Sequence, residues 1–388
     1  MIDTIRLEIK NIAPIVLQRI KLQLDSHLIL ENKSGVVLSE ITRGSLRGSW
    51  DSRISVQVRD YEYVTMQTAH TKKVGILTVI DAHNSISRPV RVTVPEFLVV
   101  EFSLPKWFEG INFINSSMVE DLRRLHYFKI WFDALLGVMT PPLSDWILKR
   151  IDIAYCFDLK NYLHILRYVQ TFRNLDFPRR KKPQFYQDSF FCAGSTTTIK
   201  GYAKETEFKA HDYRRLYQYT RDKDFADAVL EMTKGLFRFE VEFKSRKIES
   251  LSVIKIADLL NVNWGDEMKK EMYKLIKGGK SGKVFKYTEV LERLKSANIK
   301  GSGISVESCS AIWGTIVLEG DKYAKKQYGK MKVSRALKIF ESLGITTLGL
   351  IKETKISPVL TEVNLISYDV QNGDDLRNKY NALIKKAA

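Results

Sequence analysis

Hydrophobic and polar residues alternate along several short segments of the first hundred residues. The alternation runs through Met1–Lys10, Arg53–Arg59, Val90–Val94 and Phe97–Ser103, with Pro95 between the last two segments. A period of two places successive side chains on opposite faces of a β-strand, so each segment predicts a strand with one buried face. Turn residues between the segments favour an antiparallel sheet.

The spacing changes to that of a helix at Ser117, which forms a capping box with Glu120. Apolar residues then recur at helical intervals until Gly137 and two following prolines end the pattern. A long helix is therefore predicted after the first group of strands.

Two stronger strands are predicted over Lys149–Asp158 and Leu236–Arg246, with a helix over Tyr162–Phe172 and a strand-like segment over Phe190–Tyr202 between them. Beyond residue 250 the spacing is mainly helical. Helices are predicted over Leu251–Leu260, Trp264–Ile276, Tyr287–Ser296, Cys309–Leu318 and Lys332–Leu343.

These elements predict an α+β protein in which an antiparallel sheet core with packed helices is followed by a mainly helical C-terminal domain. We place the boundary near residue 250, which gives a first domain of residues 1–250, with sub-parts of about 1–112 and 113–250, and a second of residues 251–388. The segment 278–283 is rich in glycine, lysine and serine and predicts a flexible joint.

Charge points to a polyanionic partner. The chain holds 62 Lys and Arg against 45 Asp and Glu, a formal net charge of +17, and residues 251–388 are the more basic part. No apolar run approaches the roughly 18–20 residues that span a membrane, so nucleic acid is favoured over a membrane. Three scattered cysteines and the lack of a signal-peptide pattern lead us to expect a reduced, cytoplasmic protein.

The strand at 236–244 has an apolar face and a charged face. The charged face carries Arg238, Glu240 and Glu242, and the strand at 149–158 places Arg150 and Asp152 on one face in the same way. If the two strands are neighbours, Asp152, Glu240 and Glu242 could hold Mg²⁺ or Mn²⁺, which prefer oxygen ligands. A solvated face of an amphipathic sheet explains the pattern about equally well.

A third candidate is Tyr202, which an extended backbone would place on one face with Lys200 and Lys204. A free tyrosine is a poor nucleophile, and flanking lysines would favour its phenolate. The six histidines show no close pair, so any metal would be held chiefly by acids.

Ordered sequence blocks resemble the gene II replication proteins of filamentous phages and related phage and plasmid rolling-circle initiators. The blocks are Met1-Ile2-Asp3-Thr4-Ile5, Gly48-Ser49-Trp50, the segment from Glu101 through Lys106 to Gly110 and Asn112, Arg150-Ile151-Asp152, Tyr202-Ala203-Lys204, and Gly235-Leu236 with Arg238-Phe239-Glu240. A looser likeness extends from Trp313 to Gly344-Ile345, and Trp50 departs from the smaller aromatic residue expected.

The resemblance implies an enzyme that nicks one strand at an origin, keeps a 5′-phosphotyrosine, and later rejoins the strand. It implies Tyr202 as the nucleophile, and we expect Lys204 to stabilise phosphate charge and Arg238 to orient a carboxylate. Expected partners are duplex and single-stranded origin DNA in a bacterial host cell, with host helicase and polymerase. The residues expected to contact DNA are Lys106, Arg150, Arg179, Arg180, Lys181, Lys182, Lys200, Arg238, Lys332, Arg335 and Lys338.

Two features of the DNA-contacting set have simpler explanations. The basic helix at 332–338 follows Gly329 as in a helix-turn-helix, but a basic surface helix of a bundle fits the pattern better, a difference that the net positive charge narrows without removing. The basic run 179–182 precedes Phe185 and Tyr186, which could stack on single-stranded DNA, whereas a disordered loop explains it nearly as well. Alternative functions are a non-catalytic DNA-binding replication or transcription regulator and a metal-dependent hydrolytic nuclease.

Overall fold

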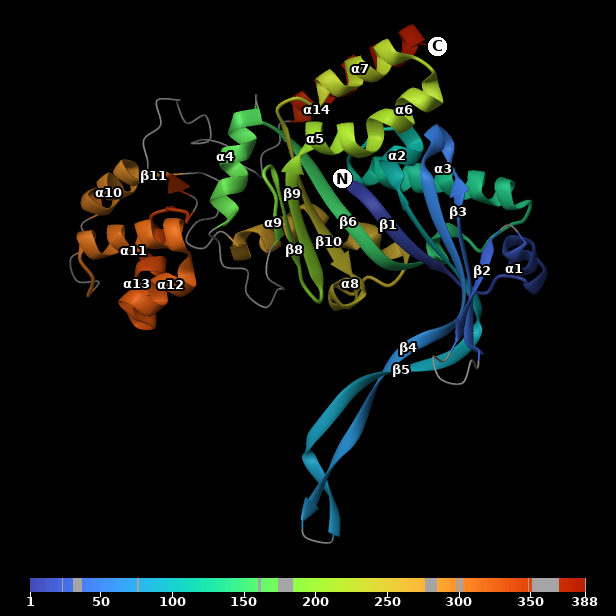
Figure 1. Ribbon diagram of the computed structural model, residues 1–388, viewed down its shortest axis with the longest axis horizontal. Helices are drawn as coiled ribbons and strands as arrows, with labels where there is room; N and C mark the ends of the chain where they lie inside the picture. Colours follow the sequence, from blue (N-terminus) through green and yellow to red (C-terminus); the bar gives the residue numbers. More distant parts are fainter. Residues whose placement is uncertain are drawn as a thin grey trace.

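A computed structural model shows one large antiparallel sheet with helices packed on it (Figure 1), which confirms the α+β class. It describes residues 1–22, 24–30, 37–74, 77–159, 162–173, 184–275, 285–297, 299, 303–347, 349–350 and 370–387. Within these residues the sheet has ten strands, in the order β2 (Asp25–Leu30), β3 (Val37–Arg47), β4 (Arg53–Val74), β5 (Leu77–Ser103), β1 (Ile2–Ile9), β6 (Ile147–Asp158), β10 (Leu236–Lys244), β9 (Thr197–Ala203), β8 (Ser189–Ala193) and β7 (Gln184–Phe185).

Most helices belong to the second half of the chain. The α-helices are α1 (Pro14–Lys21), α2 (Leu104–Glu109), α3 (Met118–Leu136), α4 (Tyr162–Arg173), α5 (Lys204–Glu207), α6 (Tyr213–Thr220), α7 (Lys223–Met232), α8 (Ser245–Ser250), α9 (Trp264–Leu275), α10 (Tyr287–Ser296), α11 (Val306–Glu319), α12 (Asp321–Tyr328), α13 (Lys330–Ser342) and α14 (Val370–Ala387). Short turns of helix are η1 (Ser49–Asp51), η2 (Leu143–Asp145), the π-helix η3 (Phe208–Asp212) and η4 (Ile256–Asn261), and β11 (Phe285–Lys286) pairs with β12 (Gly349–Leu350).

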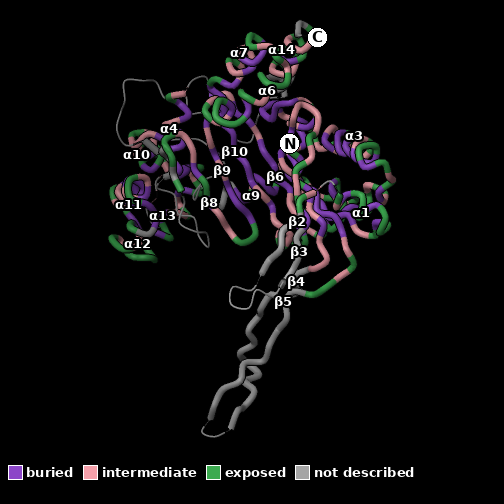
Figure 2. The backbone as a smooth tube through the Cα atoms, turned by 45° about the vertical axis from the view of Figure 1, so that its right-hand side comes forward, coloured by how far each residue is buried: buried purple, intermediate pink, exposed green. Residues whose placement is uncertain are grey.

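Helices α1, α3, α4, α8 and α9 cover the apolar face of the sheet. Phe128 and Phe132 of α3, Tyr168 of α4 and Trp264 of α9 are at most 1% exposed and pack with the apolar residues of β1, β6 and β10. Figure 2 shows how much of the backbone of β6 and β10 is buried. Burying one such side chain contributes roughly 1.5–3 kcal/mol, so this face supplies much of the stability. The predicted capping box of α3 is confirmed, with Ser117 and Glu120 bonded reciprocally.

The opposite face of the sheet carries charged residues and is covered at one end by α6, α7 and α14. Helix α14 lies beside α7 (Figure 1), and its Tyr380 packs against Phe225 with ring centroids 6.2 Å apart. Its Arg377 pairs with Glu120 at the start of α3. The C-terminal helix thus packs on the part of the protein that contains the large sheet.

A separate apolar cluster is formed within residues 285–345 by α10, α11, α12 and α13. By contrast, Ile256, Trp264 and Met268 belong to the core of the large sheet. The domain boundary near residue 250 stays a prediction, and this packing favours a later boundary. The predicted joint at 278–283 lies outside the described residues.

Strands β4 and β5 form a long hairpin that extends away from the rest of the sheet (Figure 1). The prediction of separate strands on either side of Pro95 was wrong, because β5 runs through this residue. The register shifts between the pairs Arg59–Phe97 and Tyr61–Thr93, so Pro95 lies in a bulge. A proline is tolerated there because it has no ladder hydrogen bond to donate.

Two further sequence predictions were wrong in detail. The segment 190–202 is a hairpin of β8 and β9, closed by a backbone hydrogen bond of 2.9 Å from Gly194 to Thr197. The helix predicted over 251–260 is reduced to η4, because residues 254–256 pair with the start of β6 instead, including a 2.8 Å bond from Leu148 N to Ile254 O. Among the described residues, no helix has both the length and the apolar character needed to cross a membrane.

Candidate active site

The two carboxylate-bearing strands are direct neighbours, as the proposed site requires. Strand β10 pairs antiparallel with β6 so that Glu242 lies opposite Asp152, and with β9 so that Glu240 lies opposite Lys200. Because side chains alternate along each strand, these residues and Tyr202 share the charged face of the sheet. The structure therefore brings together the acids, the lysine and the tyrosine that the sequence singled out.

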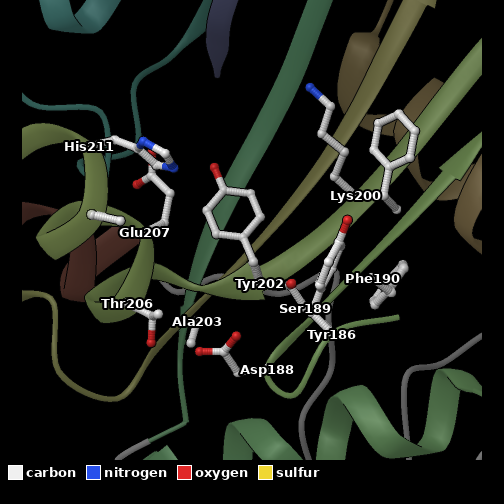
Figure 3. A pocket seen from close by; sticks show the side chains of 12 residues that line it. Tyr186, Asp188, Ser189, Phe190, Lys200, Tyr202, Ala203, Thr206, Glu207 and His211 are labelled. Carbon is white, nitrogen blue, oxygen red and sulfur yellow. The ribbon is translucent and has the colours of Figure 1, made fainter. Parts of the chain in front are cut away.

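Tyr202 lies against Glu240 in the wall of a pocket of about 280 Å³. Its hydroxyl donates a 2.5 Å hydrogen bond to Glu240 Oε1. In Figure 3 the Tyr202 ring lies between Lys200 on one side and Glu207 and His211 on the other. Burial, with the negative charge of Glu240, raises the pKa of Tyr202 well above its ordinary value, so the resting hydroxyl is protonated.

Cationic side chains hold Glu240 in its ionised form. Arg238 Nε donates to Glu240 Oε1 at 2.7 Å, and Lys200 Nζ lies 3.4 Å from Oε2. Burial opposes ionisation, but Arg238, Lys200 and the hydrogen bond from Tyr202 together lower the pKa of Glu240. Glu240 is therefore a carboxylate placed to accept the proton of Tyr202.

Asp152 is 1% exposed and is bound by two cations. Arg150 donates to both carboxylate oxygens at 2.7 Å, and Lys200 Nζ lies 3.4 Å from Oδ2. Burial nevertheless raises the pKa of Asp152 to about 6. Arg150 also reaches Glu101 at 2.8 Å and Glu242 at 3.6 Å, so one guanidinium contacts three acids.

The predicted metal ligands are arranged around a lysine. Lys200 Nζ is equidistant from Asp152 and Glu240, where a cation shared by the two carboxylates would lie. Across the described part of the chain, no three Asp, Glu, His or Cys side chains form a group that could hold a metal ion. As they are arranged, Asp152, Glu240 and Glu242 do not fit a Mg²⁺ site, and the use of Mg²⁺ or Mn²⁺ stays a prediction.

Lys204 is buried and does not reach the open face of the sheet, and the phosphate-stabilising role expected for it stays a prediction. Strand β9 ends at Ala203 and Lys204 begins α5, so the alternation stops one residue before it. The Lys204 side chain is 0% exposed, and its ammonium donates to Asn112 Oδ1 at 2.6 Å and pairs with Glu207 and Asp212. A buried ammonium with these partners positions the chain around Tyr202.

A chain of buried polar contacts connects Lys204 back to Tyr202. Asn112 accepts from Lys204 and donates to Asp3 Oδ1 at 2.9 Å. Asp3 Oδ1 in turn pairs with Arg238 Nη2 at 2.9 Å, and Arg238 holds Glu240. We call Asp3, Asn112, Lys204, Arg238 and Glu240 the buried polar chain. Asp3 lies on β1, Asn112 follows α2, Lys204 begins α5, and Arg238 and Glu240 lie on β10. Several separate sequence blocks therefore contribute to the buried polar chain.

The residues expected to contact DNA fall into different environments. Arg238 is 3% exposed and donates to Glu240, so it can orient that carboxylate, and its expected DNA contact stays a prediction. Lys106 is about one-fifth exposed and pairs with Asp212 at 2.9 Å. Arg150 and Lys200 are each 24% exposed on the charged face of the sheet.

The C-terminal basic residues Lys332, Arg335 and Lys338 are exposed on α13. Gly329, with φ of 84°, separates α12 from α13, in agreement with the glycine-containing turn predicted there. Their contact with DNA stays a prediction. Residues 179–182 of the basic run lie outside the described residues.

Sequence reasoning did not single out Asp3, Glu207, Asp212 or His211 as site residues. Asp3 lies in the first family-like block, but strict alternation along its strand assigns it to the apolar face. Glu207 follows Lys204 by three residues, a helical spacing that could have paired the two, whereas Asp212 lies eight residues on, beyond the reach of that signal. His211 lines the Tyr202 pocket but has no neighbouring histidine in the sequence.

Comparison with known protein families finds a match over most of the chain. The family described as the N-terminal part of the phage replication-associated gene II protein matches residues 1–271, a range that contains the whole large sheet and every residue of the buried polar chain. No curated protein and no solved structure matches the chain. The chain therefore belongs to the gene II family of phage replication-associated proteins, which its sequence blocks resemble.

Proposed function

We propose that the protein initiates rolling-circle replication by nicking one strand of origin DNA with Tyr202. Membership of the gene II family supports the replication role. The observation that carries the chemistry is the 2.5 Å hydrogen bond from the Tyr202 hydroxyl to the ionised Glu240 beside an open pocket. A tyrosine paired with a carboxylate base in this way has the arrangement of an activated nucleophile.

In the proposed step the Tyr202 oxygen attacks the scissile phosphorus while its proton passes to Glu240. The bond from phosphorus to the 3′ oxygen breaks, that oxygen takes a proton from water, and the hydroxide left behind takes up the proton held by Glu240. The raised pKa of Tyr202 and the lowered pKa of Glu240 disfavour a free phenolate. Proton transfer must therefore accompany formation of the phosphorus–oxygen bond.

The 5′ end is then held as a phosphotyrosine ester, and the free 3′ hydroxyl primes synthesis by the host polymerase, with a host helicase opening the duplex. Attack of a 3′ hydroxyl on the ester returns the proton to Tyr202 and rejoins the strand. No ATP is needed, because the ester retains the energy of the broken bond.

Lys200 and Arg150 are the cations best placed to meet the phosphate. Each is 24% exposed on the charged face, beside the fully buried members of the site. A phosphate approaching Tyr202 would compete with Asp152 and Glu240 for Lys200. The exposed basic residues of α13 would bind backbone phosphates elsewhere on the DNA.

The test is a nicking assay with supercoiled circular DNA that carries the element's own replication origin, in the presence of Mg²⁺. The wild-type protein is expected to give an open-circular product and a covalent protein–DNA adduct at the 5′ end. Tyr202→Phe should give neither, while still binding the DNA. Tyr127→Phe is a matched control, since Tyr127 is an exposed tyrosine on α3 outside the site.

Each outcome separates the alternatives. A nick without an adduct would support a hydrolytic nuclease, and binding without a nick would support a non-catalytic regulator. An adduct that persists in Tyr202→Phe would overturn the assignment of the nucleophile. Tyr186, which lines the same pocket, would then be the next candidate.

A further inference from the structure

The C-terminal helix α14 contacts the loop at residues 110–116, which carries Asn112 of the buried polar chain and is called here the Asn112 loop. We propose that α14 is a clamp on this loop and that Arg377 and Tyr380 are positioning residues for the site around Tyr202. The inference rests on the proposed function for the reaction that the clamp affects. Helix α14 lies beyond residue 271, where the family match ends, so the clamp adds a part of the chain that the match does not cover.

Two side chains of α14 bind backbone oxygens at the two ends of the loop. The Tyr380 hydroxyl donates to the backbone oxygen of Glu109, and Arg377 Nη2 donates to the backbone oxygen of Asn115 at 2.9 Å. The other terminal nitrogen of Arg377 pairs with Glu120 in the first turn of α3. Because the two acceptors next to the loop and within it belong to the main chain, these bonds fix the path of the loop itself.

The apolar face of α14 packs on the same loop. Tyr380 is 1% exposed, and Ile111 and Phe113 of the loop are 0% exposed. They belong to one apolar cluster, to which α14 contributes residues at helical spacing, namely Leu376, Tyr380, Leu383 and Ile384. The loop is therefore packed against α14 as well as hydrogen-bonded to it.

The other side of the Asn112 loop is bonded to the site. Arg238 donates to the backbone oxygen of Asn112, and the same guanidinium holds Glu240, the proposed acceptor of the nucleophile's proton. The Asn112 side chain donates to Asp3 at 2.9 Å and accepts from Lys204 at 2.6 Å. A shift of this loop would therefore move the groups that hold Glu240.

Asn115 attaches the loop to the sheet where β1 ends. The pairing of β1 with β6 reaches Ile153. Further along β6, Asn115 Oδ1 accepts from Cys156 N at 3.1 Å, and its Nδ2 donates to Cys156 O at 3.3 Å. Cys156 lies opposite Arg238 on β10, and Arg238 Nη1 lies 3.4 Å from Cys156 Sγ. The bond from Arg377 to Asn115 thus supports the backbone beside the arginine that holds the proposed base.

The first measurement is single-turnover nicking by the full chain at saturating supercoiled origin DNA with Mg²⁺. Arg377→Met removes the guanidinium but keeps a long side chain, and it should nick about ten-fold more slowly than the wild type, less than the roughly 100-fold that a 1 Å misplacement can cost. Arg377→Lys, which keeps the charge and a donor, should recover part of the rate. Lys379→Met is the matched control, because Lys379 is an exposed residue of the same helix, and it should nick like the wild type.

The DNA concentration that gives the half-maximal rate should be the same in Arg377→Met and the wild type, because the clamp acts on the position of the site and not on DNA binding. Loss of DNA affinity with an unchanged rate at saturation would overturn the proposal.

Hydrogen–deuterium exchange of the full chain without DNA follows the loop directly. In Arg377→Met, exchange should rise in the peptides that cover residues 110–117 and 154–158, and it should stay at the wild-type level in α1 and α11. Tyr380→Phe keeps the buried ring and removes only the hydroxyl, so it should raise exchange in residues 110–117 to a smaller extent. Tyr323→Phe is its control, because Tyr323 is a 51% exposed tyrosine on α12.

A wild-type nicking rate in Arg377→Met would overturn the clamp, and so would a slower rate with unchanged exchange in the loop. A rise in exchange throughout the protein would mean general destabilisation and would also overturn it. The two proposals fail separately. If the wild type does not nick, the proposed chemistry is rejected and the exchange pattern still decides whether α14 clamps the loop, whereas a Tyr202-dependent nick at the wild-type rate in Arg377→Met rejects only the clamp.

Discussion

Replacing Lys204 by methionine is expected to destabilise the protein rather than to affect the chemistry alone. Methionine keeps a long apolar side chain but removes the ammonium from a position that is 0% exposed. The loss leaves Asn112 Oδ1, an acceptor on a 4% exposed residue, without its donor, and it removes one of three cations around Asp212. Both consequences act on the folded state.

The magnitude follows from the partners that remain. Asp212 keeps Lys106 at 2.9 Å and Arg215 at 3.4 Å, so its pKa, held at about 2 against the opposing effect of burial, should rise only part of the way toward 3.8. The full difference corresponds to about 2 kcal/mol. An unsatisfied buried acceptor costs roughly 1–3 kcal/mol. We therefore expect about 3 kcal/mol, the low end for breaking a buried ion pair.

Urea unfolding near neutral pH, followed by tryptophan fluorescence, measures this loss. The midpoint should fall while the dependence of the free energy on urea is unchanged. Lys234→Met is the matched control, because Lys234 pairs with Glu231 at three residues' separation on the surface, where a single ion pair contributes little. This control should unfold like the wild type.

A Lys204→Met protein with wild-type stability that fails to nick would refute the reasoning. It would mean that the ammonium leaves its buried partners to contact the phosphate, which was the role expected from the sequence. Conversely, a destabilised variant whose nicking rate, measured well below its unfolding transition, is close to that of the wild type would identify Lys204 as a structural residue only.

Two further substitutions test the electrostatics around Tyr202. Asp3→Asn removes a negative charge that contributes to the raised pKa of Tyr202, so the pH dependence of single-turnover nicking, measured across roughly pH 6–10, should shift to lower pH; an unshifted profile would leave Asp3 with a structural role only. Burial raises the pKa of Asp152 in the folded protein to about 6, above the ordinary value of 3.8. The protonated carboxyl therefore stabilises the folded state below pH 3.8. This contribution, about 3 kcal/mol, is lost as the pH rises through 6. The wild type should therefore gain stability relative to Asp152→Asn between neutral pH and about pH 4 in urea unfolding, and a constant difference between the two would contradict the burial argument.

The site residues on β6, β9 and β10 could be predicted because these strands are regular. Alternation places Asp152, Glu240, Lys200 and Tyr202 on one face, and the pairing of the strands brings them together. The adjacency of β6 and β10 could not be predicted, because strands 78 residues apart along the chain become neighbours only through the packing of the elements between them.

Asp3 was missed because of an irregularity in β1. The pairs Ile2–Ile153 and Ile5–Ile151 show that β1 holds one residue more than β6 at this point. The bulge keeps both isoleucines in the core while Asp3 reaches Arg238 on the charged face. Strict alternation assigns Asp3 to the apolar side with Ile5, so a period-two pattern alone cannot find it.

Tyr202 and Lys204 belong to one short motif, yet the structure gives them different environments because β9 ends between them. Up to Ala203 the parity of the strand fixes the direction of each side chain, and Tyr202 therefore lines the pocket with Lys200. At Lys204 the backbone becomes helical, and the side chain turns into the interior toward Asn112 and Asp212. The spacing of the motif can then be understood physically: the tyrosine must be the last outward residue of the strand, and the lysine must be the first residue that anchors the strand's end. A shift of either residue by one position would separate the nucleophile from the contacts that hold its carboxylate.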